Sequence, residues 1–372
     1  MTRPAPKGWC PGAWRPMETG DGWIVRVRPR ACRLNATQVL GLCAAARAHG
    51  NGLIDLTSRA NLQIRGVRSD TLAPLQTDLG ALGLLDADAG TETRRNILTS
   101  PLAVPGDLTI TLTDALQARL GELPDLPAKF GFAVDCGETR LLAQASADIR
   151  IERGETGLLV RADGAARGRA VDPDTAIDTA IKLTHWFAVH RGTARRMKDA
   201  VLALREDWQT SAPAPEAPPL QPGASPAGQV LGAAFGSIDA GALTALMAGS
   251  QATALITTPW RLFVLMGAET LPASPFLTHP DDPLLRVDAC PGVPLCTSAT
   301  VDTRGLAKVL AGAPDTLHVS GCAKGCARPR AAKRTLVGRD GRFDLVIDGC
   351  SWDEPARRGL DPDALAKGTE QI

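Results

Sequence analysis

Four cysteines lie in two short loops that are rich in glycine and proline. The first loop runs from Cys290 to Cys296 and the second from Cys322 to Cys326. Glycine and proline turn the chain sharply and let backbone amides approach inorganic sulfide. The pattern predicts four thiolate ligands of a 4Fe-4S cluster. A structural zinc site, which usually has roughly two to four residues between paired cysteines, and a chance grouping of buried thiols are the alternatives.

The segment between the two loops contains one predicted helix and one predicted strand. Residues 304–311 place leucine and valine on one side of a helix, and residues 316–320 read as a strand. One helix followed by one strand returns the chain to its starting side. The two cysteine loops are therefore expected to face each other.

The remaining cysteines and the overall charge limit the class of protein. The chain has 372 residues and nine cysteines, and five of these lack metal-binding spacing: Cys10, Cys32, Cys43, Cys136 and Cys350. No apolar run approaches the roughly 18 residues of a membrane helix, and no secretion signal is recognisable, so we expect a soluble cytoplasmic protein whose thiols stay reduced. The 41 basic and 40 acidic residues give a net charge of +1, which argues against a nucleic-acid or membrane partner. Any basic site must be local.

A proline-rich stretch at residues 211–228 divides the chain into two related halves. Prolines at that density exclude a helix and favour an extended linker. Each half opens with a strand, an alanine- and leucine-rich helix, and a second strand entered through threonine: residues 22–27, 37–48 and 52–59, then 228–231, 240–248 and 253–265. This alternation predicts an α+β fold built by internal duplication.

At this point the sequence resembles a known family. The segment from Gly321 to Pro329 resembles the 4Fe-4S motif of the siroheme-dependent sulfite and nitrite reductase family. Further similar segments are Arg26-Val-Arg28, the stretch from Ile54 to Gln63, Arg94-Arg95-Asn96 and Pro127-Ala-Lys129-Phe130. Together they span nearly the whole chain.

The resemblance implies two pseudo-repeated halves, each with a ferredoxin-like arm and an α/β lobe. The implied domains are a ferredoxin-like half-domain at 1–70, a first lobe at 71–210, the linker at 211–228, a second half-domain at 229–280 and a cluster-binding lobe at 281–372. In siroheme enzymes the last cluster cysteine, here Cys326, also bridges to the haem iron.

One departure from the reductases concerns their second active-site lysine, whose place is taken by Gly131. Losing this charge weakens a site for a small oxyanion such as sulfite or nitrite. The opening from Gly8 to Gly12 and the stretch from His49 to Gln63 resemble instead the oxygen-dependent branch of the family, which acts in cobalamin biosynthesis. That resemblance implies hydroxylation of precorrin-3A at C20 by dioxygen, with formation of a γ-lactone.

The same resemblance implies the cofactors and the source of electrons. It adds a mononuclear non-haem iron to the cluster, but none of the five histidines forms a recognisable ligand pattern for it. The sequence contains no dinucleotide-binding motif, so we expect electrons to come from NADH through a reductase or from a ferredoxin-like donor. No catalytic acid or base is assigned.

Precorrin-3A carries eight carboxylates, and arginine binds carboxylates bidentately without losing its charge. The substrate-binding candidates are Arg26, Arg28, Arg59, Arg65, Arg94, Arg95 and Lys129. For each of them a solvated surface charge is the ordinary alternative. Two other functions stay open: a compact siroheme-dependent sulfite or nitrite reductase, and a non-catalytic iron–sulfur electron carrier or sensor, in which these cations would be incidental.

Overall fold

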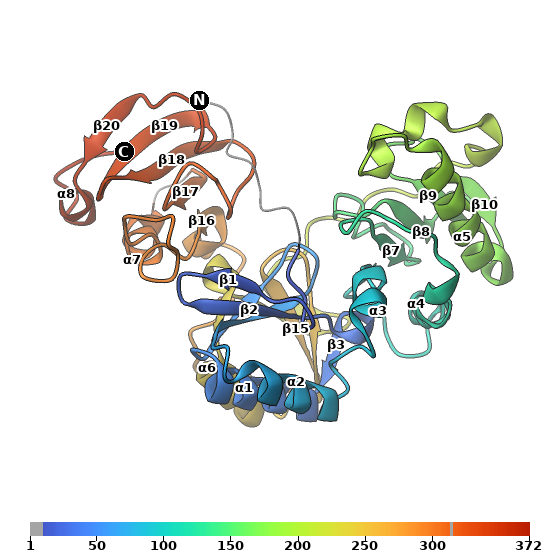
Figure 1. Ribbon diagram of the computed structural model, residues 1–372, viewed down its shortest axis with the longest axis horizontal. Coiled ribbons are helices and arrows are strands. Elements are labelled where there is room, and N and C mark those ends of the chain that lie inside the picture. Colours follow the sequence, from blue (N-terminus) through green and yellow to red (C-terminus); the bar gives the residue numbers. More distant parts are fainter. Residues whose placement is uncertain (1–9, 313–314) are drawn as a thin grey trace.

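The computed structural model describes residues 10–312 and 315–372. The chain forms a central body and two lobes that stand on opposite sides of it (Figure 1). Gly8 and Trp9 of the predicted N-terminal motif, and the first nine residues of the predicted half-domain 1–70, lie outside the described residues. None of the helices in the described ranges has the length and apolar character needed to cross a lipid bilayer.

The central body contains two five-stranded antiparallel sheets, and corresponding strands of the two halves of the chain occupy equivalent positions in them. The first has the order β1 (Met17–Thr19), β2 (Gly22–Val27), β5 (Leu62–Val67), β4 (Leu53–Leu56) and β13 (Ser237–Asp239). The second has the order β11 (Gly223–Ser225), β12 (Gly228–Gly232), β15 (Leu262–Met266), β14 (Ala254–Thr257) and β3 (Arg33–Asn35). The two sheets are therefore related by the internal repeat.

Each central sheet ends in a strand that belongs to the other half of the chain. In the first sheet β13 pairs with β4, with Ile238 opposite Ile54. In the second sheet β3 pairs with β14, with Leu34 opposite Leu255. This exchange joins the two halves by backbone hydrogen bonds as well as by packing.

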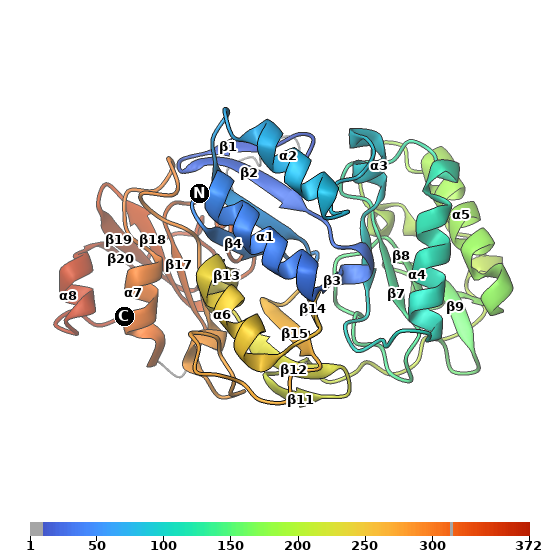
Figure 2. The same ribbon diagram turned by 90° about the horizontal axis from the view of Figure 1, so that it is seen from below.

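Helices α1 (Ala36–His49), α2 (Leu72–Ala81) and α6 (Ala240–Ser250) cover the central sheets (Figure 2). A capping box starts α1, because the Asn35 side chain accepts a hydrogen bond from the Gln38 backbone nitrogen and the Gln38 side chain accepts one from that of Asn35. The Asp239 side chain caps α6 in a similar way. The core beneath these helices includes Leu42, Ile54, Ile64, Leu75, Leu79 and Phe263. Because α2 contributes to it, this core continues past residue 70.

The two lobes also share one topology, in which three parallel strands are followed by two antiparallel ones. The first lobe has the order β10 (Arg169–Val171), β9 (Leu158–Ala162), β8 (Ile149–Arg153), β7 (Phe132–Asp135) and β6 (Ile97–Thr99), with helices α4 (Leu108–Ala118) and α5 (Pro173–His190). The second, here called the cysteine lobe, has the order β16 (Val287–Ala289), β17 (Leu317–Ser320), β18 (Ala332–Arg339), β19 (Arg342–Gly349) and β20 (Arg357–Leu360), with helices α7 (Arg304–Val309) and α8 (Pro362–Ala366). The short helix α3 (Ala89–Arg94) lies between the central body and the first lobe (Figure 1). The predicted α+β fold of two repeated halves is confirmed.

The proline-rich stretch predicted as a linker begins along the edge of the first lobe. Ser211, Pro213 and Glu216 form isolated β-bridges with Gly168, Gly154 and Arg140. Strand β11 then starts within the same stretch. The segment thus carries the chain from the first lobe to the outer strand of the second central sheet.

Candidate functional site

The two cysteine loops follow two adjacent parallel strands of the cysteine lobe. Cys290 comes directly after β16, and Cys322 is separated from the end of β17 by Gly321. Because the carboxyl ends of parallel strands meet at one edge of a sheet, both loops lie on the same side, as expected from the intervening helix and strand. The Gly321 backbone nitrogen donates a hydrogen bond to the Cys290 Sγ over 3.1 Å. A Cβ atom at Gly321 would lie 2.6 Å from the Cβ of Ala299, so only glycine fits here.

The four predicted ligand cysteines are electrostatically close. Burial raises the pKa of the Cys322 thiol, and the nearby Cys290 and Cys296 thiols raise it further. Burial also raises the pKa of Cys326, with contributions from the other three cysteines. Across the described ranges, no three His, Cys, Asp or Glu side chains meet as ligands of one metal ion would. The four thiols therefore lie near enough to influence one another's pKa values, and the described residues form no site for a single ion.

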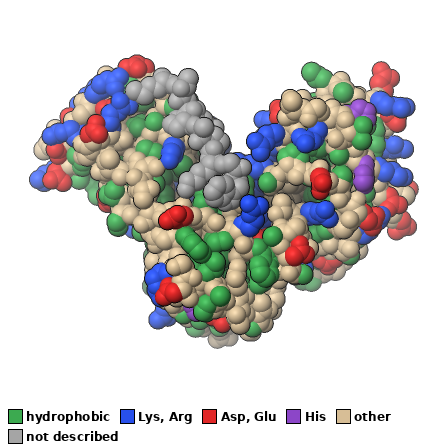
Figure 3. Space-filling model, viewed as in Figure 1, with side chains coloured by type: hydrophobic (Ala, Val, Ile, Leu, Met, Phe, Trp, Pro, Cys, Tyr) green, Lys and Arg blue, Asp and Glu red, His purple; other side chains and the backbone are tan. Residues whose placement is uncertain are grey.

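A pocket of about 700 Å³ lies between the cysteine lobe and the central body. Cys290 and Cys326 line it on one side, and Thr57, Ser58 and Gln63 line it on the other. Six arginines also border it: Arg26, Arg65, Arg261, Arg304, Arg328 and Arg330. Lys and Arg side chains are visible at the floor of the hollow between the two lobes and along its wall on the side of the first lobe (Figure 3). The pocket is thus cationic although the whole chain is nearly neutral.

Three of the predicted arginines share one electrostatic environment. The Arg26 guanidinium donates to Gln63 Oε1 over 2.7 Å. Burial, together with the nearby Arg28 and Arg59 cations, lowers its pKa to about 10. Arg59 donates to the Lys129 carbonyl oxygen over 2.9 Å, which ties the central body to the first lobe. An anion bound among these groups would relieve their mutual repulsion.

Other predicted arginines are engaged in internal contacts. Arg65 makes four hydrogen bonds within the protein: two to Asp21, one to Asp55 and one to the Leu295 carbonyl of the first cysteine loop. It borders the large pocket, but most of its donors already have partners. Arg95 forms a bidentate pair with Asp86 at 2.9 and 2.8 Å and is buried.

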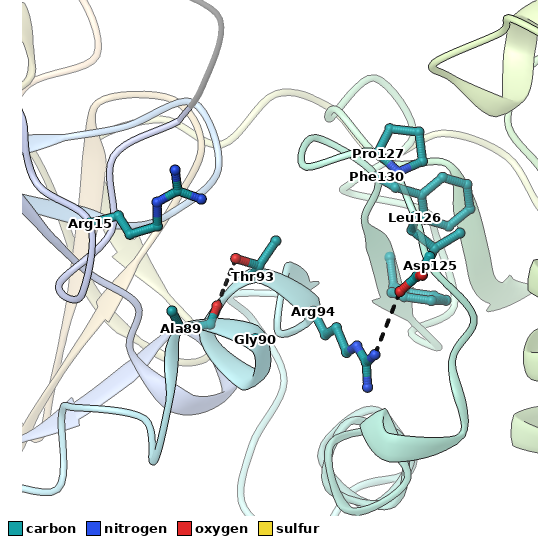
Figure 4. A pocket seen from close by; sticks show the side chains of 10 residues that line it. Arg15, Ala89, Gly90, Thr93, Arg94, Asp125, Leu126, Pro127 and Phe130 are labelled. Carbon is teal, nitrogen blue, oxygen red and sulfur yellow. Dashed lines mark hydrogen bonds and ion pairs between the residues drawn. The ribbon is translucent and has the colours of Figure 1, made fainter.

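Arg28 and Arg94 lie apart from the large pocket. Arg28 is buried beyond the end of β2 and donates to the Glu92 carbonyl oxygen over 2.6 Å. Arg94 lies 3.9 Å from Asp125 beside a smaller pocket of about 310 Å³. Figure 4 shows Arg94 turned toward Asp125, with Pro127 and Phe130 beyond that carboxylate. The structure therefore does not gather all seven predicted basic residues around one cavity.

Lys129 is exposed, in a turn before β7. Its neighbour Gly131 is tightly enclosed, because a Cβ atom there would lie 2.7 Å from both the Nδ2 and the backbone oxygen of Asn96. The Gly131 backbone nitrogen also donates to Asp148 Oδ2. The local packing thus leaves no room for a second lysine at this position.

Four pocket arginines from the second half were missed by the sequence reasoning: Arg261, Arg304, Arg328 and Arg330. One signal was available for two of them, since Cys326-Ala-Arg-Pro-Arg330 places arginines directly after the last cluster cysteine. Arg261 and Arg304 reach the pocket only because the cysteine lobe closes against the central body. No local pattern marks them.

Comparison with known proteins identifies the family and the fold of the chain. The family model described as the nitrite/sulfite reductase ferredoxin-like half domain matches residues 15–82. A ferredoxin–nitrite reductase from Leptolyngbya laminosa is 23% identical over 91% of this chain and 82% of its own length. The structure of the Mycobacterium tuberculosis NirA protein superposes with a TM-score of 0.61 at 17% identity, covering 93% of this chain and 79% of that one. The last similarity establishes the shared fold.

The similarity is higher to a precorrin-3B synthase from a Sinorhizobium species. The two sequences are 31% identical over 395 residues, which span 94% of this chain and 84% of that protein. The nitrite reductases match at lower identity. From the fold, the cysteine loops and this near full-length similarity, we conclude that the chain belongs to the precorrin-3B synthase family, a branch of the nitrite and sulfite reductase fold.

Proposed function

We propose that this protein is an oxygen-dependent monooxygenase of cobalamin biosynthesis that hydroxylates precorrin-3A at C20 and forms the γ-lactone. The observation that carries the proposal is the pocket of about 700 Å³ that six arginines and two of the cluster cysteines border. A polycarboxylate tetrapyrrole needs fixed cations of this kind. The pocket provides such cations next to two of the cysteines that we propose as cluster ligands.

Cys290, Cys296, Cys322 and Cys326 are the residues that would hold the 4Fe-4S cluster. The hydrogen bond from the Gly321 amide to the Cys290 sulfur fits a thiolate ligand, because such donors stabilise the negative charge on sulfur. When bound, a cluster of this type supplies electrons one at a time. The described residues offer no ligand set for a mononuclear iron.

The chain's own residues are assigned to binding and orientation. Arg26 and Arg59 would bind substrate carboxylates, and Lys129 would contact the substrate from the first lobe. Arg65 would hold the first cysteine loop in place through its hydrogen bond to the Leu295 carbonyl. Electrons would come from NADH through a reductase or from a ferredoxin-like donor, and the protein would act in the cytoplasm.

The alternative functions fit the site less well. A siroheme-dependent reductase of small oxyanions is disfavoured because the packing of Gly131 against Asn96 excludes a second lysine. A simple electron carrier or sensor gives no reason for an arginine-lined cavity of this size beside the cysteines. The reductase would show haem absorption bands, and a carrier would not incorporate oxygen from dioxygen into precorrin-3A.

A spectrum and a labelling experiment test the proposal. Protein purified without oxygen should be brown, with a broad iron–sulfur shoulder and no haem bands. With precorrin-3A, a reductant and isotopically labelled dioxygen, one labelled oxygen should enter the product. Intense haem bands would favour the reductase, and a product without label would overturn the hydroxylase assignment.

A matched pair of cysteine variants tests the cluster. Cys322→Ala should remove both colour and activity, because it deletes one of the four proposed ligands. Cys43→Ala removes a buried thiol from α1 that does not belong to the two cysteine loops. This variant should keep both the colour and the activity. Equal colour in the two variants would contradict the ligand assignment.

A further inference from the structure

The charges that border the large pocket do not balance. The six arginines face only two acidic residues, Asp55 and Asp288. Burying that many cations beside one another is costly unless they meet anions. An arginine whose guanidinium already has an anionic partner is less available to a ligand than one that lacks such a partner.

Each of the two aspartates lies between two arginines. Asp55 accepts from Arg65 at 3.1 Å and from Arg304 at 3.3 Å. Asp288 lies 3.2 Å from Arg261 and accepts from Arg328 at 2.8 Å. These four guanidinium groups are therefore held by carboxylates of the protein itself.

Two arginines remain without a carboxylate partner among the described residues. Arg26, on β2, has the neutral Gln63 side chain as its main hydrogen-bond acceptor, and the Cys10 side chain is a second partner. Arg330, in the loop between Cys326 and β18, is exposed and forms no ion pair with any described residue. The two come from different parts of the fold, one from the central body and one from the cysteine lobe.

The chain before Arg330 is well anchored, so its position is defined. Arg328 donates to Asp288 and, through Nε, to the Ala331 carbonyl over 2.9 Å. Pro329 fixes one further backbone angle in between. An anchored loop presents the free Arg330 side chain at the pocket with little backbone entropy left to lose on binding.

We propose that Arg330 is a substrate-recognition residue that, together with Arg26, binds carboxylate groups of the anionic tetrapyrrole beside the cluster cysteines. This inference rests on the proposed function and assigns part of the recognition to the cysteine lobe. Arg65, Arg261, Arg304 and Arg328 instead shape the pocket through their internal carboxylate partners. Two guanidinium groups without a carboxylate partner, on different walls, would fix the orientation of the macrocycle relative to the cysteines.

The test is a binding measurement that does not require turnover. Uroporphyrin III, a fluorescent tetrapyrrole with eight carboxylates, is titrated into the cluster-containing protein without oxygen, and precorrin-3A is used in parallel. Arg330→Ala should weaken binding of both by about tenfold to a hundredfold, because a charge-assisted hydrogen bond is lost. Arg330→Lys should recover part of this loss, since it keeps the charge without the bidentate geometry.

Arg286→Ala provides the matched control. Arg286 is also an exposed arginine of the cysteine lobe, but it lies outside the pocket lining, and its variant should bind as the wild type does. Iron–sulfur absorption equal to that of the wild type verifies that each variant is folded. If the wild type binds both tetrapyrroles and Arg330→Ala binds them equally well, the assignment of Arg330 is wrong while the proposed function stands. If the wild type binds neither, the proposed function fails as well.

Discussion

His318 predicts how the stability of the cysteine lobe depends on pH. It lies on β17, opposite Asp288 on β16 and Thr335 on β18, and it is fully buried. Neither ring nitrogen has a hydrogen-bond partner among the described residues. Burial lowers its pKa from 6.5 to about 4, with Asp288 opposing the shift and Arg328 adding to it.

The sign of the effect follows from proton uptake. Between these two pKa values the unfolded chain binds a proton at His318 and the folded chain does not, so the folded state loses stability as the pH falls. Proton linkage lowers the free energy of unfolding by about 2 kcal/mol between pH 7 and pH 5. The loss reaches about 3 kcal/mol once the pH is below the pKa values of His318 in both the unfolded and the folded chain. His318→Leu should remove this contribution.

Hydrogen–deuterium exchange of peptides covering β17 measures the effect. The protection factors of the β17 amides, corrected for intrinsic exchange, are compared at about pH 7 and pH 5. Their decrease should be roughly 20-fold larger in the wild type than in His318→Leu. His279→Leu removes an exposed histidine and should behave like the wild type. The reasoning would be refuted if His318→Leu and the wild type showed the same pH dependence.

Three further substitutions test the packing and the ion pairs described above. Gly131→Ala places a methyl group against Asn96, so we expect a lower melting temperature and a loss of roughly 1–3 kcal/mol of stability; an unchanged melting temperature would contradict the close packing. Arg95→Met leaves the buried Asp86 with only the more distant Arg30, 3.9 Å away, and should cost about 3 kcal/mol while the folded protein keeps its iron–sulfur absorption. Arg65→Met should lower stability similarly but also speed cluster loss, because Arg65 holds the cysteine loop; equal cluster retention in the two arginine variants would argue against that role.

The parts of the site that could be predicted from sequence depend on short-range spacing. The two cysteine loops carry their own glycines and prolines, and the helix and strand between them are local patterns. The duplication was visible for the same reason, since each half repeats a strand, a helix and a strand. These signals do not require knowledge of distant contacts.

The roles of the arginines depend on contacts that a linear sequence does not display. Arg65 and Arg26 lie on neighbouring strands, yet one is held by two aspartates and the other faces a glutamine. Arg261 and Arg304 enter the pocket through closure of the cysteine lobe. The sequence therefore identifies a set of cations but does not separate those that bind the protein's own carboxylates from those that have no carboxylate partner.

The exchanged strands β3 and β13 have a consequence for synthesis of the chain. While the ribosome is still producing the second half, the first central sheet lacks its outer strand and β4 exposes an open edge of backbone donors and acceptors. That edge is covered only after Ser237–Asp239 has emerged. A chain severed between residues 217 and 222 would yield two fragments that are each incomplete, and each fragment would carry the strand that the other one needs.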